Sequence, residues 1–446
     1  MVLEAVTRYD DSRVSQKQGR AIVVGSGVAG LCAARVLADR FTEVIVIEQD
    51  PLPDEPSTRR GVPQASQPHV LQEAGRATLE DLFPDYGEAL LSTGGLLIDA
   101  ASDLSYYYDG GYLANGPKRI PMYCASRPLF ERTLRTRVTA IDEITVRTRT
   151  TLIDYLTEDT TRIHGVEVRG QNAEKTELDA DLIVDATGRT SRTPNWLKEH
   201  GYRPPPVEEI QVDVTYSTVV IDRPTDERHA IIVPPSPPRT RGGAVLPIED
   251  GRWLVTVQGI HGERAPTDPD EVVSFANSLP NDEVAQLLET HEWLGDEVRH
   301  YPFPSNVRRR YEALDRFPDG LLVTGDAIAS FNPLYGQGMS VAALDALELH
   351  HALAAGQRES LSSRFFRRVA SVIDTAWTIA IGADLEYPQA NDPTPRKAKL
   401  LGWYLSRLRQ GAQSDGTLTD AFLRVSTMEK DPLSLVRPSV IRRTLF

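Results

Sequence analysis

The spacing of apolar residues changes along this chain and divides it into segments. Two short apolar runs, Ala21–Val24 and Val44–Ile47, flank a stretch with helical spacing. This order predicts strand, helix and strand, the unit from which parallel sheets are built. Between residues 206 and 310 the pattern turns to alternation, as in Gln211–Ile221 and Trp253–Ile260, which predicts mostly antiparallel strands. After residue 361 the chain is mainly helical in pattern.

We therefore expect an α/β fold: a Rossmann-type domain with an inserted, mostly antiparallel β domain and a C-terminal helical region. The Rossmann-type domain is expected to be interrupted by the inserted sheet and then to resume. The predicted bounds are 1–19 for a flexible or loosely docked leader, 20–205 for the first part of the Rossmann-type domain with an excursion to the inserted sheet near 96–125, 206–310 for the inserted sheet, 311–360 for the return segment and 361–446 for the helices.

The turn after the first predicted strand carries the pattern G-x-G-x-x-G at Gly25, Gly27 and Gly30. The first glycine permits a sharp turn, the second lets a pyrophosphate approach the backbone, and the third lets the helix pack closely on the sheet. The helix begins near Val28 and Ala29, so its N–H groups and positive dipole end face that phosphate. The context predicts dinucleotide binding, and the alternative is an ordinary βαβ unit with a glycine turn.

An acidic residue closes the second strand, and a long polar loop follows it. Glu48 stands where a carboxylate can accept both hydroxyls of an adenosine ribose, with Gln49 next to it. The loop carries Arg59 and Arg60, which either clamp a phosphate or ribose or form a solvated basic turn. His69 follows in a segment with the pattern of an amphipathic helix start. A catalytic role and a plain helix-start or core role are both open for it.

Two further apolar runs end in turns where ligands gather in α/β folds. One runs into Asp185 and Gly188, which by themselves also fit a simple turn. The other runs into Gly325 and Asp326, and a glycine-rich loop, Asn332–Gly338, then leads to the N-terminus of a predicted helix. This second arrangement is again a place to hold an anionic or polar group.

The composition narrows the class of protein. The net charge of −14 disfavours a nucleic-acid partner, and the two cysteines, Cys32 and Cys124, exclude a disulfide framework and a structural metal site of their own. The segment Met1–Gly19 is polar, without the apolar core of a secretory signal. No uninterrupted apolar run approaches the roughly 20 residues that span a bilayer. We expect a cytoplasmic protein without an integral membrane span.

The end of the chain mixes basic and apolar residues. Two interpretations stay open: a solvated terminal helix, or a weak peripheral contact with a membrane surface or a partner. The residues concerned are Arg437, Val440, Ile441, Arg442, Arg443 and Leu445.

Together these motifs resemble the FAD-dependent monooxygenase superfamily with the p-hydroxybenzoate hydroxylase type of fold, over most of residues 20–360. The resemblance implies that the first glycine motif holds the ADP part of FAD, that Asp326 binds the ribityl chain, and that Arg127, at the start of a helix, lies along the cofactor. It also implies that Pro333–Gly338 contacts the isoalloxazine. The predicted cofactor-binding residues are Gly25, Gly27, Val28, Ala29, Gly30, Glu48, Gln49, Arg59, Arg60, Arg127, Asp185, Gly188, Gly325, Asp326, Gly336, Gly338 and Met339, and the catalytic candidates are His69, Pro333 and Gly336.

Two local features refine the resemblance. Many aromatic hydroxylases of the superfamily read D-G-x-x-S where this chain reads D-A-T-G-R-T-S at Asp185–Ser191, which argues against their direct way of handling NAD(P)H. The segment Gly61–Gln64, with His69 and the long helical tail, is similar to the bacterial branch of squalene-epoxidase-like and polyether-type olefin epoxidases. The W-x-W-x-I-P motif of the related halogenases is not found in the sequence.

The resemblance implies chemistry carried by the cofactor. Reduced FAD would react with O₂ to give a C4a-hydroperoxide, whose distal oxygen epoxidises or hydroxylates a lipophilic secondary metabolite, with a polyketide or terpenoid alkene favoured. Electrons would come from NADH or NADPH, directly or through a flavin reductase. Three alternatives stay open: an aromatic hydroxylase, a reductase of isoprenoid double bonds of the geranylgeranyl-reductase kind, and a non-catalytic flavin- or nucleotide-binding protein.

Overall fold

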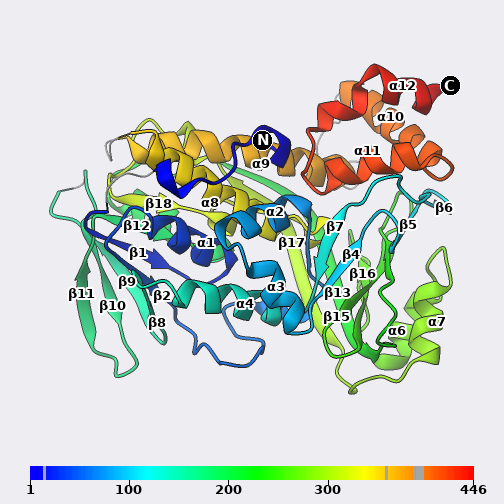
Figure 1. Cartoon of the computed structure of the whole chain (residues 1–446), viewed down its shortest axis with the longest axis horizontal. Helices are drawn as coiled ribbons and strands as arrows, with labels where there is room; N and C mark the ends of the chain where they lie inside the picture. The colour runs from blue at the N-terminus through cyan, green and yellow to red at the C-terminus, as the bar shows by residue number, and fades with distance from the viewer. Residues whose placement is uncertain (14–16, 160, 357–359, 385–386, 388–395) are drawn as a thin grey trace.

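The computed structural model describes residues 1–13, 17–159, 161–356, 360–384, 387 and 396–446. Within them the chain has the predicted mixed α/β fold, with several sheets and helices at its C-terminal end (Figure 1). The two largest sheets lie in different parts of the molecule, and the loops that connect them position the candidate site.

A five-stranded parallel sheet forms the first of these parts, in the order β18-β12-β1-β2-β8. The apolar runs of the sequence form its strands, and the side chains of β1 and β2 are almost fully buried beyond the first residue of each. Burial on both faces explains why these strands read as continuous apolar runs. The bounds are Arg20–Val24 for β1, Glu43–Ile47 for β2, Ile144–Arg147 for β8, Leu182–Asp185 for β12 and Leu321–Val323 for β18.

Helices cover this sheet, and α8 is the most deeply buried of them. The helix α8 (Gly338–Ala354) packs against α1 (Val28–Leu37), α2 (Glu73–Leu82) and α9 (Leu361–Asp384). Almost every side chain of α8 is buried, including the polar side chains of Asp345, Glu348 and His350 among its many apolar ones. The remaining helices of this part are α3 (Tyr86–Ser92), α4 (Arg127–Thr139) and α5 (Thr193–Glu199).

An eight-stranded sheet, in the order β19-β17-β13-β16-β15-β14-β5-β6, forms the second part. Its pairs are antiparallel except β14 with β5. Two helices, α6 (Pro269–Ala276) and α7 (Glu283–Thr290), share an apolar core with it. The strands are β5 (Leu104–Tyr108), β6 (Gly111–Tyr112), β13 (Val207–Asp222), β14 (Ala230–Val233), β15 (Arg241–Ile248), β16 (Arg252–Gly259), β17 (Arg299–Arg309) and β19 (Ala329–Ser330).

Two small sheets complete the fold. One is antiparallel and contains β9 (Thr151–Leu156), β10 (Gly165–Arg169) and β11 (Lys175–Asp179). The other contains β3 (Val70–Leu71), β4 (Leu96–Asp99) and β7 (Pro121–Cys124). His69 therefore precedes a strand, and the prediction that it begins a helix is wrong. The helix α2 starts four residues later, at Glu73.

The first residues of the chain contact the rest of the protein, so of the two alternatives given for the leader, flexible or loosely docked, the structure favours docking for residues 1–13. Val2 and Val6 are buried. The backbone N–H of Leu3 donates to the carbonyl of Met428 at 3.1 Å, and a ring nitrogen of His351 lies 2.8 Å from the carbonyl oxygen of Thr7. Because the segment is mostly polar, its sequence does not show that these two valines hold it in place.

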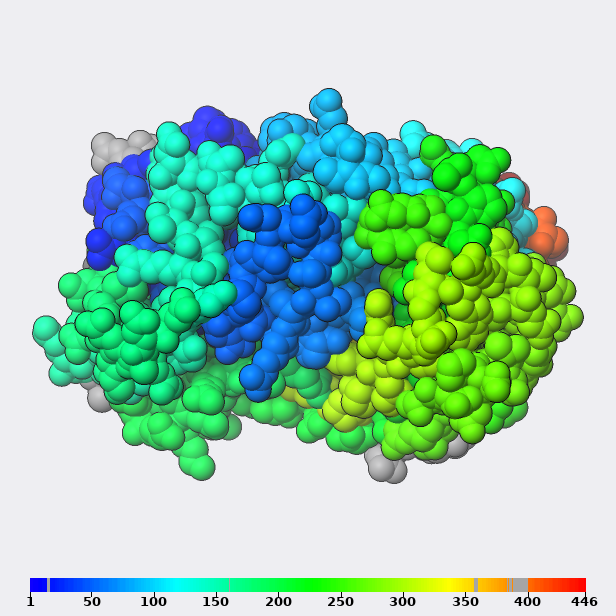
Figure 2. Space-filling view, turned by 90° about the horizontal axis from the view of Figure 1, so that it is seen from below, coloured from blue at the N-terminus to red at the C-terminus, as the bar shows by residue number. Residues whose placement is uncertain are grey.

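The C-terminal helices lie at one end of the molecule (Figure 1). They are α10 (Arg396–Ala412), α11 (Gly416–Ser426) and α12 (Pro438–Leu445). Viewed from below, the loop after β2 is the blue segment at the centre of the face, between the cyan-to-green segment that contains α4 and β8–β11 on one side and the yellow-green segment that contains α6, α7 and the start of β17 on the other (Figure 2). This loop thus lies between the two parts of the molecule.

Candidate dinucleotide site at the carboxyl end of the parallel sheet

The three glycines after β1 have different surroundings. Gly25 has φ +104°, and a Cβ there would lie 2.5 Å from the carbonyl oxygen of Ala186. A Cβ on Gly30 would lie 1.9 Å from the carbonyl oxygen of Gly25. A Cβ on Gly27 would meet no atom within 4 Å, although Gly27 is the N-cap of α1. The fold therefore requires two of the glycines, while the third faces open space at a helix N-terminus, as an anion cradle needs.

The structure brings the three glycine-containing turns together. A Cβ on Gly325 would lie 2.6 Å from the Cβ of Ala29, and a Cβ on Gly30 would lie 3.3 Å from the Cβ of Ala186. The N-terminus of α1, the turn after β12 and the turn after β18 thus meet at the carboxyl ends of three adjacent strands. This is where open α/β sheets bind their ligands.

Glu48 is held in a fixed orientation beside this cradle. Its Oε2 accepts from the backbone N–H of Ser26 at 3.0 Å and from the Ser26 hydroxyl at 2.6 Å. Its Oε1 accepts from the backbone N–H of Asp50 at 2.9 Å. A carboxylate has about four lone-pair positions, so Oε1 keeps room for one more donor. Gln49, between the two acids, is exposed.

Of the paired arginines, only Arg59 turns inward. Its Nη1 lies 3.0 Å from Glu48 Oε2 and 3.2 Å from Asp50 Oδ2, and its Nε lies 2.6 Å from Glu131 Oε1. Burial opposes the charge, but Glu131 and Glu48 outweigh it and raise the pKa of Arg59. Arg60 is exposed. Arg59 thus fixes the loop after β2 against the site, and the predicted direct role of Arg60 has no support from its position.

Asp185 serves its own loop, contrary to the prediction that it contacts a cofactor. Its Oδ1 accepts from the N–H and the hydroxyl of Thr187, and its Oδ2 accepts from the hydroxyls of Ser191 and Thr193. Four donors fill a carboxylate, so no acceptor position is left for a ligand. Gly188 differs, because it has φ +78° and a Cβ there would meet no atom within 4 Å.

Arg127, His69 and Asp326 form a second group of charged and polar side chains. Arg127 is the first residue of α4, and it is buried with its Nε unpartnered among the described residues. Asp326 is half-buried in the turn after β18. Burial raises the pKa of Asp326, while Arg127 and Arg189 act in the opposite direction. Arg127 and Asp326 therefore present a cation and an acceptor to the same region.

His69 is neutral in this environment. Burial, and then the charge of Arg127, lower the pKa of His69 to about 3. Its Nδ1 lies 2.8 Å from the carbonyl oxygen of Gln67, so Nδ1 carries the proton and Nε2 is left as an acceptor. A histidine with this pKa supplies no acid at neutral pH. The predicted catalytic role of His69 is thereby reduced to accepting a hydrogen bond.

The loop before α8 contains buried polar atoms without partners. Gly336 has φ +63°, and Gln72 Nε2 donates to the carbonyl of Tyr335 at 2.8 Å. The Oε1 of Gln72, both amide atoms of Gln337 and the hydroxyl of Ser340 have no hydrogen-bond partner among the described residues. Buried polar atoms are nearly always satisfied in folded proteins. Four such atoms around one loop are the pattern that a polar ligand edge would complete.

Three more predicted residues, Pro333, Gly338 and Met339, lie in this loop or at the start of the helix that follows it. A Cβ on Gly338, the first residue of α8, would meet no atom within 4 Å. Met339 is buried behind it, and Pro333 begins the short 3₁₀ turn Pro333–Tyr335. The predicted residues of this loop therefore lie together at the N-terminus of a long buried helix.

Sequence reasoning missed Asp384, the last residue of α9. It is buried, and it accepts from Asn306 Nδ2 at 2.8 Å, Asn332 Nδ2 at 3.2 Å and the Tyr335 hydroxyl at 2.8 Å. Burial raises the pKa of Asp384. The network ties the C-terminal part of the chain to the loop before α8. No sequence signal reveals it, because its members lie up to 78 residues apart.

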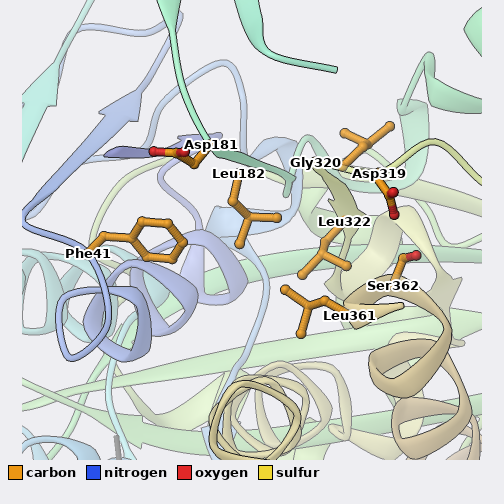
Figure 3. Close-up of a pocket in the computed structure, with 9 residues that line it drawn as sticks. Phe41, Asp181, Leu182, Asp319, Gly320, Leu322, Leu361 and Ser362 are labelled. Atoms are coloured by element: carbon orange, nitrogen blue, oxygen red, sulfur yellow. The ribbon is translucent and has the colours of Figure 1, made fainter. Parts of the chain in front are cut away.

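Two cavities lie instead at the opposite, amino end of the parallel sheet. A cavity of about 30 Å³ lies there, where Leu182, Leu322 and Leu361 converge (Figure 3). It has room for about one water molecule. A broader groove of about 630 Å³ beside it is lined partly by Arg20 and Glu43, which form an ion pair at 2.6 Å. Because ligands bind at carboxyl ends of such strands, neither cavity is the dinucleotide site.

Among the described residues, no three His, Cys, Asp or Glu side chains gather in a way that could hold a metal ion. No helix in the described part of the chain is both long enough and apolar enough to cross a bilayer.

A dinucleotide cradle at the carboxyl end of a parallel sheet, joined to a large antiparallel sheet, defines a dinucleotide-binding flavoprotein class. The chain belongs to the family of the FAD binding domain, whose model matches residues 19–366. FAD is thus its cofactor. The open glycines, the unpartnered atoms of Gln72 and Gln337, and the helix N-termini fit a bound dinucleotide with a polar ring edge.

Several known proteins are similar to this chain. Protein Rv3254 of Mycobacterium tuberculosis is 32% identical over 427 residues, which cover 92% of this chain and 90% of that protein. The structure of PqsL from Pseudomonas aeruginosa, a probable FAD-dependent monooxygenase, matches with TM-score 0.60 at 20% identity, over 82% of this chain and 96% of that one. A flavoprotein/dehydrogenase from Cytophaga hutchinsonii matches with TM-score 0.65 at 15% identity, over 95% and 96%. The two structures share the fold.

Proposed function

We propose that this protein is a FAD-dependent monooxygenase that transfers one oxygen atom from O₂ to a lipophilic substrate. Epoxidation of an alkene, in a polyketide or terpenoid, is favoured over hydroxylation. The observation that carries the proposal is the loop before α8, where buried polar atoms have no partner among the described residues and where Leu334 packs against a buried apolar and aromatic cluster.

The polar side of the loop suits the flavin ring. Gln72 and Gln337 offer buried amide groups that can pair with its polar edge, and Gly338 leaves room for it. Asp326 would accept from a ribityl hydroxyl, and Glu48 would use its spare Oε1 position for the adenosine ribose. When bound, FAD supplies the activation of O₂.

The apolar cluster beside the loop suits a lipophilic substrate. Leu334 packs against this buried cluster of the eight-stranded sheet, which includes Tyr216 and Phe303, with Tyr301 beside it. A substrate held against it would be shielded from water. His69, which is neutral, adds no proton donor to it. Epoxidation needs no base on the substrate, whereas hydroxylation of a phenol benefits from one.

Electrons would come from NADH or NADPH, directly or through a flavin reductase in the cytoplasm. The departure from D-G-x-x-S at Asp185 favours a reductase or reduction only after substrate binds. Fold likeness alone also fits a dehydrogenase, as the Cytophaga protein is described. An aromatic hydroxylase and an isoprenoid reductase therefore remain the alternatives to test.

The experiment is a set of turnovers with FAD-loaded protein, a nicotinamide or chemical reductant, and isotopically labelled O₂. Model terpenoid alkenes and phenols serve as substrates. We expect an epoxide that carries the label in reactions with alkenes. A labelled phenol product alone would replace epoxidation by aromatic hydroxylation. A saturated product without label would replace the monooxygenase by a reductase.

A further inference from the structure

Exposed apolar side chains are concentrated at the C-terminal end of the chain. Among the described residues ten large apolar side chains are exposed, and seven of them lie beyond residue 399. We call these seven the C-terminal apolar patch: Leu400, Leu401, Trp403, Leu433, Val436, Leu445 and Phe446. The other three, Leu91, Val207 and Leu294, belong to separate elements or loops. Scattered exposed leucines need no explanation, but a concentration of this kind marks an interaction surface.

The patch lies on a region that has its own core. Tyr404 and Leu408 of α10 and Leu435 of the 3₁₀ helix Pro432–Val436 are buried in one cluster, with Ile441 of α12 packed against it. The exposed residues are the outer faces of these same elements. Leu400 and Trp403, 66% and 51% exposed, are three residues apart on α10 and so lie on one face. The apolar side chains are therefore exposed although the helices are well packed.

The charge of this region is opposite to that of the whole protein. Residues 400–446 contain seven Lys or Arg and four Asp or Glu, whereas the chain has a net charge of −14. Three of the four acids are paired within the region, Asp420 and Glu429 with Arg424, and Asp415 with Arg443. Arg407, Arg437 and Arg442 are exposed and have no acidic partner among the described residues. The apolar patch is thus interspersed with cations.

We propose that the C-terminal apolar patch docks on the anionic surface of a lipid bilayer. Leucine, tryptophan and phenylalanine side chains would enter the boundary between head groups and acyl chains, and the arginines would contact lipid phosphates. Tryptophan is a typical residue of this boundary. A symmetric contact with a second copy is disfavoured, because it would bring the same cations together. Docking of this kind would use exposed side chains and their charges and would be independent of the reaction.

The test uses the full FAD-loaded protein and vesicles of phosphatidylcholine with or without phosphatidylserine. We expect co-sedimentation with the anionic vesicles only, and its loss at high salt. The double variant Arg437→Gln/Arg442→Gln should bind roughly 10- to 30-fold more weakly, from the contribution of each cation near the surface. The double variant Leu400→Ser/Leu433→Ser should also weaken binding. Leu91→Ser and Leu294→Ser, which change exposed leucines elsewhere, should leave binding unchanged.

The fluorescence of Trp403 can report contact of the patch with a vesicle. Trp403 is 51% exposed, whereas Trp196, Trp253 and Trp377 are buried. Its emission should shift to shorter wavelength on anionic vesicles, and Trp403→Phe should remove the shift while sedimentation persists. Equal binding to both kinds of vesicle, or none, would overturn the proposal. Concentration-dependent dimers that the leucine variants abolish, without vesicle binding, would assign the patch to a second copy instead.

Discussion

The two ends of the parallel sheet differ in whether their polar groups have partners. At the amino end the polar groups are paired: Arg20 binds Glu43, and its backbone N–H donates to Asp181 at 3.0 Å. At the carboxyl end, the Oε1 of Gln72 and both amide atoms of Gln337 are buried without a partner among the described residues. Buried unpartnered atoms also occur elsewhere in the described chain. They therefore indicate the cofactor site only where they coincide with the carboxyl ends of the parallel strands and with the open glycines.

The largest expected effect is a loss of FAD binding without a loss of folding, in a variant of the glycine turn. In Gly27→Ala the added methyl enters space that no protein atom fills, so the apoprotein should fold and melt like the wild type. FAD retention should be lost, because the methyl occupies the path of the pyrophosphate. Gel filtration followed by measurement of bound flavin checks this. Gly170→Ala, where a Cβ also meets nothing within 4 Å, is the matched control and should retain FAD.

The next effect compares two aspartates at opposite ends of the sheet. Asp326→Ala should weaken FAD binding roughly 10- to 100-fold, since a charge-assisted hydrogen bond contributes about 1.5–3 kcal/mol. Asp319→Ala, which changes an aspartate beside the amino-end cavity, should leave the affinity unchanged. Titration of apoprotein with FAD, followed by flavin fluorescence, measures both. Equal effects of the two substitutions would mean that Asp326 has only a structural role.

A pH effect on stability concerns the turn that contains Asp326. Asp345 of α8 accepts from the N–H of Gly325 at 3.1 Å, and its Oδ1 has no partner among the described residues. Burial raises the pKa of Asp345 to about 8, from an ordinary value of 3.8. The native state thus keeps a proton that the unfolded chain releases, so this contribution to stability is complete below about pH 4 and is lost as the pH rises to 8.

Asp345→Asn should remove that dependence. Between pH 5 and 7 the wild type should lose up to about 1.4 kcal/mol per pH unit relative to the variant. Denaturant unfolding of both apoproteins across this range gives the difference. Parallel stability curves for the two proteins would show that Asp345 is ionised in the native state.

The smallest expected effect concerns the ribose. Glu48→Gln should weaken FAD binding roughly three- to tenfold, about the value of one hydrogen bond, while Arg59 keeps Asp50 and Glu131. Glu43→Gln breaks the ion pair at the amino end and should leave FAD affinity unchanged. If isothermal titration gives the same affinity for Glu48→Gln and wild type, another residue recognises the ribose.

Local patterns predicted the parallel sheet well. The glycine turn, α1 and β2 follow one another within 30 residues, so spacing alone places them. The strand β17 was not predicted, because Pro302 and Pro304 interrupt its alternating pattern. Its antiparallel pairing with β13 holds it in the sheet in spite of the two prolines. Long-range pairing of this kind leaves no signal in a single segment.

The position of the site could be predicted from the sequence, but the contacts of its individual side chains could not. The glycines and Asp326 could be read from turns that end apolar runs. The ion pair between Arg59 and Glu131 joins residues that are 72 positions apart in the sequence, and the hydrogen bond from Tyr335 to Asp384 joins residues that are 49 positions apart. Asp185 was misjudged for a different reason, since its four donors come from Thr187, Ser191 and Thr193 in the loop that follows it, and the sequence does not show which way these side chains turn. Only the folded chain shows which carboxylates remain available.

The most direct test of the account is the flavin content of purified protein after reconstitution with FAD and gel filtration. We expect one FAD per chain in the wild type and in the amino-end variants Asp319→Ala and Glu43→Gln, and none in Gly27→Ala. Protein that retains no FAD, or a Gly27→Ala variant that retains as much as the wild type, would contradict the assignment of the cofactor to the carboxyl end of the sheet.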